Sequence, residues 1–240
     1  MTDTSMENKS IISISRLIKR FPMGKDEFTA LRDISLTFTE GEFAGLIGPS
    51  GSGKTTLLNI IGSLDVPTEG EALVLGRSIG KLTTREAARL RKENIGFIFQ
   101  SYNLLAVHTV YENVEFPLLL LNIPSAGRHK MVMDALEWVG LTDKVRSKPP
   151  QLSGGQCQRV AIARAMVKKP SLVLADEPTA NLDADNSHHI LQTMETLNRE
   201  LKTTFIFATH DDKVISYLHR KIFLLDGRVD KDEIIRSNKR

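Results

Sequence analysis

The sequence has a single cysteine, Cys157, and no long apolar run. One cysteine excludes an intrachain disulfide and any metal site built from several thiolates, and this usage is typical of a reducing compartment. The least polar stretch, residues 116–127, is only 12 residues long and contains Pro117 and Pro124, whereas a bilayer span needs about 20 residues. Residues 1–10 carry two acids and no apolar core, so no signal peptide is expected.

The chain also lacks a strong excess of either charge. Thirty-two Lys and Arg against 29 Asp and Glu leave a net charge of +3 without a localised basic patch, so no nucleic-acid partner is expected. Apolar residues make up 41% of the sequence and there are 16 glycines, a composition that favours folding over disorder. A length of 240 residues allows one domain or two small ones.

Short apolar runs alternate with segments of helical periodicity, which predicts an α/β fold. Residues 172–175 and 204–208 lack apolar/polar alternation, so we expect central parallel strands that are covered on both faces. The predicted strands are residues 11–15, 34–38, 43–47, 72–75, 95–99, 172–175, 204–208 and 222–225.

Helical periodicity is clearest over residues 190–201, where an apolar stripe predicts a helix lying on a sheet face. Between strands 95–99 and 172–175 there is no good strand, and this stretch predicts an inserted helical subdomain over about residues 101–170. Its helix candidates are residues 110–121, 125–139 and 155–167. Asp226-Gly227 indicates a turn, and residues 230–240 are predicted to form a charged, solvated tail.

Residues 48–55, GPSGSGKT, fit the phosphate-loop pattern G-x-x-x-x-G-K-[ST] between a predicted strand and a helical run that starts at Thr56. Glycines let successive N–H groups point inward at a phosphate, and the helix N-terminus adds positive potential. Lys54 supplies a point charge, and the Thr55 hydroxyl is the expected magnesium ligand. The loop alone predicts only a nucleoside triphosphate site, because kinases, GTPases, recombinase-like and transport ATPases all use it.

Polar side chains follow three other predicted strands. Asp176 and Glu177 end strand 172–175, Gln100 follows strand 95–99, and His210 follows strand 204–208. Ligands of open α/β sheets bind at the carboxyl ends of strands, so we expect these residues to converge on the phosphate loop. We interpret Asp176 as the metal partner and Glu177 as the base that deprotonates the attacking water.

A second glycine-rich motif, LSGGQ at residues 152–156, starts a helical run. Ser153 is the candidate N-cap of that helix, and the following N–H groups form a second potential anion site. Considered alone, the motif would most simply be an ordinary helix start.

In chain order, the phosphate loop, Gln100, LSGGQ, Asp176-Glu177, Asn181-Leu182-Asp183 and His210 resemble the nucleotide-binding domain of ATP-binding cassette (ABC) ATPases. The resemblance covers essentially all 240 residues and implies one domain over 1–240. It implies a P-loop NTPase core of largely parallel sheet flanked by helices, with an antiparallel β region and the inserted helical subdomain. It also implies ATP and Mg²⁺ as cofactors and head-to-tail pairing of two copies of the chain.

The resemblance assigns roles residue by residue. The LSGGQ motif of one chain is expected to close on the γ-phosphate held by the other, Asp183 to communicate across the pair, and Phe21 to stack on adenine. Gln100 is expected to contact magnesium and water and to relay closure to a partner. The predicted nucleotide-binding residues are Phe21, Gly48, Ser50, Gly51, Ser52, Gly53, Lys54, Thr55, Thr56, Gln100, Ser153, Gly154, Gly155, Gln156, Asp183 and His210. The predicted catalytic residues are Glu177, His210, Gln100 and Lys54, and the predicted magnesium ligands are Thr55, Gln100 and Asp176.

Several further segments look like the bacterial branch that contains lipoprotein-releasing, macrolide- and peptide-export and cell-division ATPases. They are residues 41–43, 57–60, 96–105 and 175–179. The sequence departs from that branch at Cys157, where Gln is usual, at Ala180, where Gly is usual, and at Phe21, where Tyr is commoner. None of these changes removes a catalytic group. Ala180 in place of glycine leaves the geometry of the loop before Asp183 open.

We therefore expect the ATP-hydrolysing subunit of a transporter or membrane-remodelling complex, acting on a separate transmembrane permease. It would be cytoplasmic and peripheral at the inner face of the membrane through that permease. A docking surface is predicted from the apolar residues Leu104, Leu105, Val107, Phe116, Leu118, Leu119 and Leu120.

Two alternatives remain open. A soluble ABC-type ATPase of DNA repair or translation usually shows a second cassette or a long coiled coil, and this sequence shows neither. An ATP-dependent switch with little turnover is disfavoured by Glu177 and His210.

Overall fold

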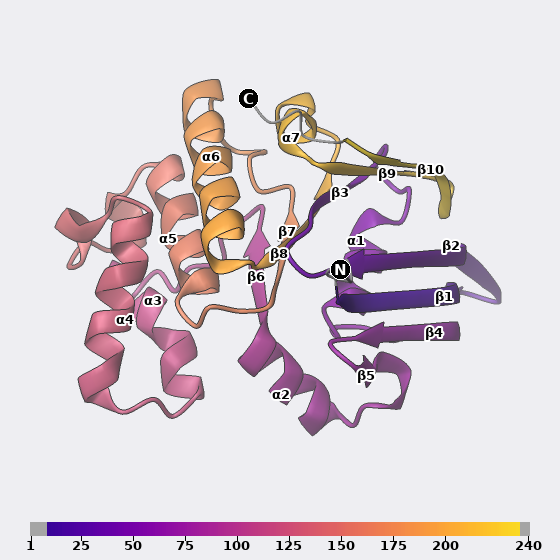
Figure 1. Ribbon diagram of the computed structural model, residues 1–240, viewed down its shortest axis with the longest axis horizontal. Helices are drawn as coiled ribbons and strands as arrows, with labels where there is room; N and C mark the ends of the chain where they lie inside the picture. Colours follow the sequence, from indigo (N-terminus) through magenta and orange to yellow (C-terminus); the bar gives the residue numbers. More distant parts are fainter. Residues whose placement is uncertain (1–8, 236–240) are drawn as a thin grey trace, which may run out of the picture.

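The computed structural model describes residues 9–235, which form two β-sheets and the helices around them (Figure 1). The larger sheet has six strands in the order β10-β9-β3-β8-β7-β6, parallel except for β10, which runs antiparallel to β9. Its strands are β3 (Phe43–Ile47), β6 (Ile95–Phe99), β7 (Leu172–Asp176), β8 (Thr204–Thr209), β9 (Arg220–Leu225) and β10 (Arg228–Ile234).

Both faces of the central strands β3, β7 and β8 are buried, as their unalternating apolar sequences predict. Successive side chains of a strand point to opposite faces. In β8, Phe205 and Phe207 therefore join a core under the helices, whereas Ile206 and Ala208 join a second core under the smaller sheet. The predicted α/β class is confirmed.

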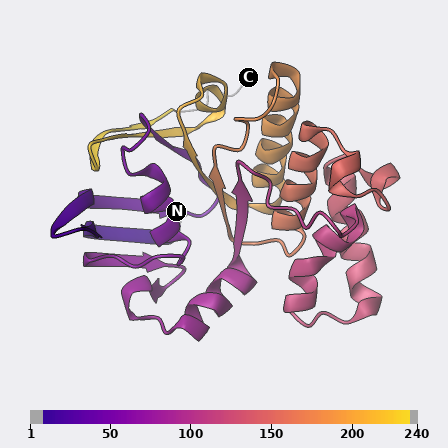
Figure 2. The same cartoon turned by 180° about the vertical axis from the view of Figure 1, so that it is seen from behind.

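The smaller, antiparallel sheet has the order β2-β1-β4-β5. Its strands are β1 (Ser10–Met23), β2 (Asp26–Thr39), β4 (Glu69–Val74) and β5 (Arg77–Ser78). β1 and β2 form a long hairpin that turns at Gly24, whose φ of 66° is left-handed. Figures 1 and 2 show this sheet on the opposite side of the molecule from helices α3–α5.

Helices cover the larger sheet and fill the interval between β6 and β7. They are α1 (Lys54–Ile61), α2 (Thr84–Asn94), α3 (Val110–Leu120), α4 (Ser125–Trp138), α5 (Gly154–Met166), α6 (Ala184–Leu201) and α7 (Asp212–Tyr217). The 3₁₀ turns are η1 (Ile79–Lys81), η2 (Thr142–Lys144) and η3 (Pro149–Gln151). Within residues 9–235, no helix combines the length and the apolarity that a membrane crossing requires.

One prediction was wrong and others were incomplete. Residues 230–234 belong to β10 and pair with β9 instead of forming a solvated tail. Helices α2 and α7 and strand β5 were not predicted, and the first hairpin is longer than residues 11–15 and 34–38 indicated. The signal-peptide expectation falls largely on residues 1–8, and the end of the tail on 236–240, which lie outside the described residues.

Candidate functional site

The phosphate loop connects β3 to α1, and its glycines are required by space as well as by backbone angle. Gly53 has φ 100°, and a Cβ there would lie 2.7 Å from Leu31 Cδ2 and 2.8 Å from the Ala30 carbonyl oxygen. A Cβ on Gly48 would lie 2.2 Å from the carbonyl oxygen of Leu224. Only glycine at these positions lets the loop pass close to β9 at Gly48 and to β2 at Gly53.

The loop is suited to an anion. Lys54 is 7% exposed, and its Nζ donates hydrogen bonds to the carbonyl oxygens of Gly48 (2.6 Å) and Pro49 (2.9 Å). Burial lowers the pKa of Lys54, an effect partly opposed by Glu177 and Asp176. The buried Ser52 hydroxyl has no hydrogen-bond partner among the described residues. An ammonium and a free hydroxyl at a helix N-terminus fit a phosphate chain.

Thr55 and Asp176 supply the oxygen atoms that a magnesium ion prefers. The Thr55 hydroxyl lies 3.2 Å from both carboxylate oxygens of Asp176. Burial raises the pKa of Asp176, although the Thr55 hydrogen bond opposes the shift. Within residues 9–235, no three His, Cys, Asp or Glu side chains cluster as a metal site. A cation here would therefore be held partly by protein oxygen atoms and partly by phosphate oxygen atoms, as Mg²⁺ commonly is.

Glu177 is fixed by the end of the neighbouring strand. Its Oε1 lies 2.6 Å from His210 Nδ1, and the Thr209 hydroxyl donates to Oε2 at 3.2 Å. Its backbone N–H donates to the carbonyl oxygen of Ala208, and its φ of 46° is left-handed. The carboxylate is thus held beside the phosphate loop by two polar partners from β8 and the residue after it.

The loop after Gln100 is fastened at several points. The Asn181 amide donates to the Gln100 carbonyl oxygen at 2.9 Å. Arg164, on α5, donates to the carbonyl oxygens of Tyr102 (2.7 Å) and Asn103 (2.5 Å), two consecutive residues with left-handed backbone. Arg164 therefore connects the helix that LSGGQ begins to the loop that Gln100 begins, a contact that sequence reasoning missed.

These strand ends converge on one cavity of about 530 Å³. It is lined by Phe28, Ala30, Ser50, Gly51, Gly53, Lys54, Thr55, Thr56, Gln100, Asp176, Glu177, Ala180 and His210. Of the predicted site residues, Gly48, Ser52 and Phe21 are not part of its lining, and neither are LSGGQ and Asp183. Phe28 lines it although it was not predicted.

LSGGQ is instead the N-terminus of α5. The Gln156 backbone N–H donates to Ser153 Oγ (3.3 Å), and the Ser153 N–H donates to Gln156 Oε1 (2.9 Å), which forms a capping box. A Cβ on Gly155 would lie 2.6 Å from Asn186 Oδ1, so glycine is needed where α5 meets α6. Asp183 similarly caps α6.

The structure accommodates Cys157 and Ala180, two of the positions at which the sequence departs from the bacterial branch. Cys157 is buried and its thiol faces the Pro149 carbonyl oxygen at 3.6 Å; burial raises its pKa. The backbone of Ala180 lies outside the left-handed region, so the loop before Asp183 does not need glycine there.

The fold and the phosphate site define a nucleotide-hydrolysing cassette. Residues 31–180 match the family model described as "ABC transporter", and the chain belongs to the ABC transporter family.

Relatives and solved structures agree with this assignment. The chain is 45% identical over 223 residues to the uncharacterized ABC transporter ATP-binding protein YvrO of Bacillus subtilis, covering 93% of this chain and 97% of the relative. It is 41% identical over 231 residues to the uncharacterized ABC transporter ATP-binding protein MJ0796 of Methanocaldococcus jannaschii, covering 95% and 98%. The dimeric structure of MJ0796 in a post-hydrolysis state bound to ADP and Pi matches with a TM-score of 0.87 and 40% identity, covering 94% of this chain and 99% of that one.

A second structural match is cbiO1 from Clostridium perfringens, part of the ABC transporter complex cbiONQ. It has a TM-score of 0.85 and 30% identity and covers 95% of this chain and 89% of that one. The predictions of an ABC ATP-binding subunit and of ATPase activity are confirmed.

Proposed function

We propose that two copies of this chain bind ATP between them and use its hydrolysis to drive a separate transmembrane permease. One observation carries the proposal. The cavity holds the phosphate loop, Asp176, Glu177 and His210, whereas LSGGQ lies outside it at the N-terminus of α5. Each chain thus carries two half-sites, and a second copy would bring its α5 N-terminus to the phosphates. The dimeric structure of MJ0796 supports this pairing.

The hydrolytic roles follow from the side chains around the cavity. Glu177 accepts a proton from the water that attacks the γ-phosphorus, the bond to the ADP oxygen breaks, and phosphate leaves. His210 holds the Glu177 carboxylate and faces the same cavity. Lys54 and the loop N–H groups offset the negative charge of the transferred group. Thr55, Asp176 and Gln100 would hold Mg²⁺, which supplies charge neutralisation of the phosphates when bound.

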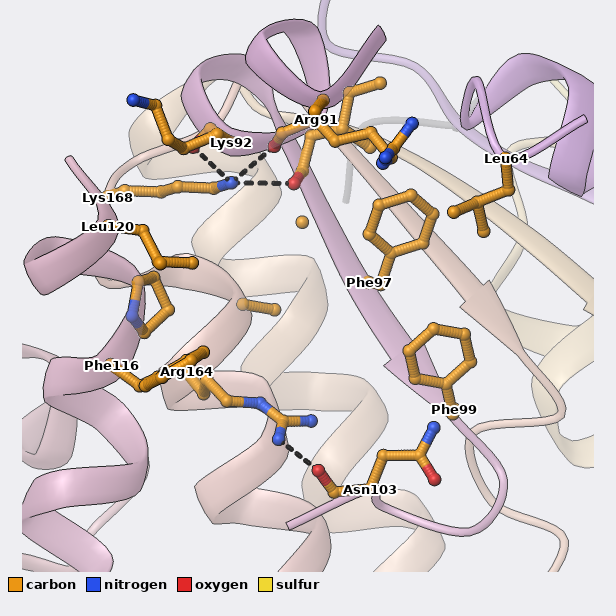
Figure 3. Close-up of a pocket in the computed structure, with 15 residues that line it drawn as sticks. Leu64, Arg91, Lys92, Phe97, Phe99, Asn103, Phe116, Leu120, Arg164 and Lys168 are labelled. Atoms are coloured by element: carbon orange, nitrogen blue, oxygen red, sulfur yellow. Dashed lines mark hydrogen bonds between the residues drawn. The ribbon is translucent and has the colours of Figure 1, made fainter. Parts of the chain in front are cut away.

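A groove of about 490 Å³ between α2, β6, α3 and α5 is the proposed docking site for an apolar helix on the cytoplasmic side of the permease (Figure 3). Phe116 and Leu120 reach it from α3, and Phe99 and Asn103 border it beside Gln100. An occupant would therefore touch the segment that Arg164 fastens. The Lys168 ammonium closes one end by donating to the carbonyl oxygens of Arg91, Lys92 and Ile95.

The predicted docking residues divide into two sets. Leu118 is fully buried, and Leu104 packs partly buried against the core. The exposed ones are Leu105, Val107, Phe116, Leu119 and Leu120. Of these, Phe116 and Leu120 line the groove, which supports a partner that keeps the chain at the cytoplasmic face of a membrane. The similar protein cbiO1 is part of the ABC transporter complex cbiONQ, which supports by analogy that this chain also works as one part of a larger complex.

The decisive experiment replaces Glu177 by Gln. The variant should bind ATP as the wild type does, lose at least about 100-fold in turnover, and accumulate as an ATP-bound dimer in size-exclusion chromatography with light scattering. Hydrolysis at the parental rate would show that Glu177 is not the base. Lys54→Ala is the matched control: it should lose ATP binding itself, and retained ATP affinity would contradict the assignment of the phosphate loop.

A further inference from the structure

Thr209 is a buried threonine at the carboxyl end of β8, directly before His210, and its hydroxyl contacts Glu177. The side chain of Thr209 is fully buried, and its Oγ1 donates to Glu177 Oε2 at 3.2 Å. Thr209 is not part of the lining of the phosphate cavity, whereas Glu177 is. An effect of the Thr209 hydroxyl on hydrolysis would therefore act through Glu177.

The pairing of β7 with β8 brings Thr209 beside Glu177. The two strands are parallel, and Asp176 pairs with Ala208, so the next residue of each strand lies one step further along the same edge. The Glu177 N–H donates to the Ala208 carbonyl oxygen at 2.9 Å, which continues the pairing beyond Asp176. The contact is thus placed by the buried centre of the sheet and does not depend on a long, mobile side chain from the surface.

The direction of the Thr209 hydroxyl proton is set by a second hydrogen bond. The backbone N–H of Asp211 donates to Thr209 Oγ1 at 3.0 Å, which occupies a lone pair of that oxygen and leaves its proton for Glu177. Asp211 is the N-cap of α7, and its carboxylate accepts hydrogen bonds from the Lys213 N–H (2.9 Å) and the Thr179 hydroxyl (3.3 Å). The start of α7 therefore fixes the N–H group that orients the Thr209 hydroxyl.

The two carboxylate oxygen atoms of Glu177 have partners of different accessibility. Oε1 lies 2.6 Å from Nδ1 of His210, whose side chain is 62% exposed and lines the phosphate cavity. Oε2 accepts from Thr209, which is buried. Water or a phosphate oxygen can compete for the exposed imidazole, but neither can reach the buried hydroxyl. Oε1 is thus the oxygen on the cavity side, and Oε2 is the one held by the sheet.

We infer that Thr209 is a positioning residue for hydrolysis, which anchors Oε2 of Glu177 so that Oε1 is presented to the attacking water. One O–H bond of that water breaks and its proton passes to Oε1, while the water oxygen bonds to the γ-phosphorus and the bond to the ADP oxygen breaks. A base held in one orientation spends more of its time in the reactive geometry, so the anchor raises kcat without adding affinity for ATP. The inference rests on the proposed role of Glu177 as the base.

Thr209→Val tests the anchor, because valine keeps the β-branched shape that suits a strand and removes the hydroxyl. In steady-state ATPase assays we expect kcat to fall about 10- to 100-fold, with KM for ATP unchanged. Thr209→Ser restores a hydroxyl on the same carbon and should recover most of kcat. Thr209→Ala, a second variant without the hydroxyl and with no added bulk, guards against a folding defect and should behave like Thr209→Val.

Thr204→Val is the matched control. Thr204 is fully buried at the other end of β8, and its hydroxyl also accepts from one backbone N–H and donates to one oxygen, with Gly41 (2.9 Å) and the Thr39 carbonyl (3.4 Å) as partners. Both valine variants should lower Tm to a similar extent, and only Thr209→Val should lower kcat. An equal loss of kcat in both variants, or an unchanged kcat in Thr209→Val, would overturn the inference.

The Glu177→Gln background distinguishes anchoring of the base from a general effect on the site. Because the base is absent there, adding Thr209→Val should leave the residual single-turnover rate of ATP hydrolysis unchanged, and a further fall would overturn the inference. If Glu177→Gln alone hydrolyses ATP at the parental rate, the proposed function fails. If Glu177→Gln is inactive while Thr209→Val retains the kcat of Thr204→Val, only the role of Thr209 fails.

Discussion

At the scale of single residues, the site holds charges where the fold alone would not favour them. Asp176 ends a buried strand, and burial raises its pKa, so ionising it costs free energy in the folded, nucleotide-free chain. Lys54 is buried next to it, and burial lowers its pKa. A raised pKa for a carboxylate and a lowered pKa for a lysine are common in sites whose charged groups serve to bind a charged ligand and do not stabilise the fold.

Replacing Asp176 by Asn should therefore stabilise the nucleotide-free protein at pH 7. A folded-state pKa above the unfolded value means that the folded chain binds more protons between these two values, so its free energy of unfolding falls as pH rises through that window. The cost is fully present above the folded pKa. We expect a gain on the order of 1 kcal/mol, or about 2–4 °C in Tm, which shrinks as pH is lowered toward the usual carboxyl range. Thermal unfolding across pH would measure it, and a destabilised variant would contradict the argument.

A site residue could be predicted from the sequence where its position follows directly from the strand before it. Asp176, Glu177, Gln100 and His210 follow apolar strands directly, and parallel strands necessarily bring those ends to one edge. Phe28 could not be found in this way. Its direction depends on the register of β1 with β2, which shifts several times along the hairpin because of bulges.

At the scale of elements, the apolar pattern predicted the buried strands and failed for elements that are mostly in water. In α2 only Leu90 is buried, so the helix has no apolar stripe to detect. Its order comes from the Thr83–Glu86 capping box at one end and from the Lys168 ammonium at the other. Burial lowers the pKa of Lys168 to about 8. β10 was missed for a similar reason, because most of its side chains are exposed.

The hydrogen bonds from Arg164 on α5 to the loop after Gln100 should support ATP turnover but contribute little to ADP binding. Arg164→Met removes two hydrogen bonds from a charged donor, one part-buried and one exposed; such bonds contribute up to about 1.5–3 kcal/mol each, and less where water competes. We expect a Tm lower by several degrees, faster amide exchange over residues 100–105, and a reduced kcat with ADP affinity little changed. Arg89→Met, which breaks only the exposed pair with Glu93, is the control and should be nearly neutral. Unchanged exchange in Arg164→Met would contradict the tether.

At the scale of the whole molecule, the phosphate cavity and LSGGQ are separate surfaces of one chain. The cavity lies where β3, β6, β7 and β8 end, and LSGGQ lies on the helical side, at the start of α5, which Arg164 joins to the loop after Gln100. The order of motifs along the sequence indicated this arrangement only through a family resemblance. The spacing of the motifs alone could not predict it, because residues that form a site only with a second copy of the chain need not lie close together within one copy.

Placing a negative charge at Ser153 should separate binding from pairing. Ser153→Asp keeps a good N-cap for α5 but would repel the phosphates of a nucleotide held by the other copy. In the Glu177→Gln background, this variant should bind ATP as a monomer with unchanged affinity and form no ATP-dependent dimer in sedimentation velocity. Ser153→Asn, which is neutral and also caps, should still pair. Loss of ATP affinity in the isolated chain would indicate instead that LSGGQ acts on its own cavity.

The left-handed backbone at Glu177 has a consequence for mutational tolerance. Glycine adopts this conformation freely and asparagine or aspartate at modest cost, whereas valine, isoleucine and threonine resist it. In a saturation library at codon 177 sorted only for soluble expression, Gly and Asn should therefore be enriched and the β-branched residues depleted. Sorting the same library for growth that depends on ATP hydrolysis should retain Glu alone. Selection for folding and selection for hydrolysis should therefore favour different residues at position 177.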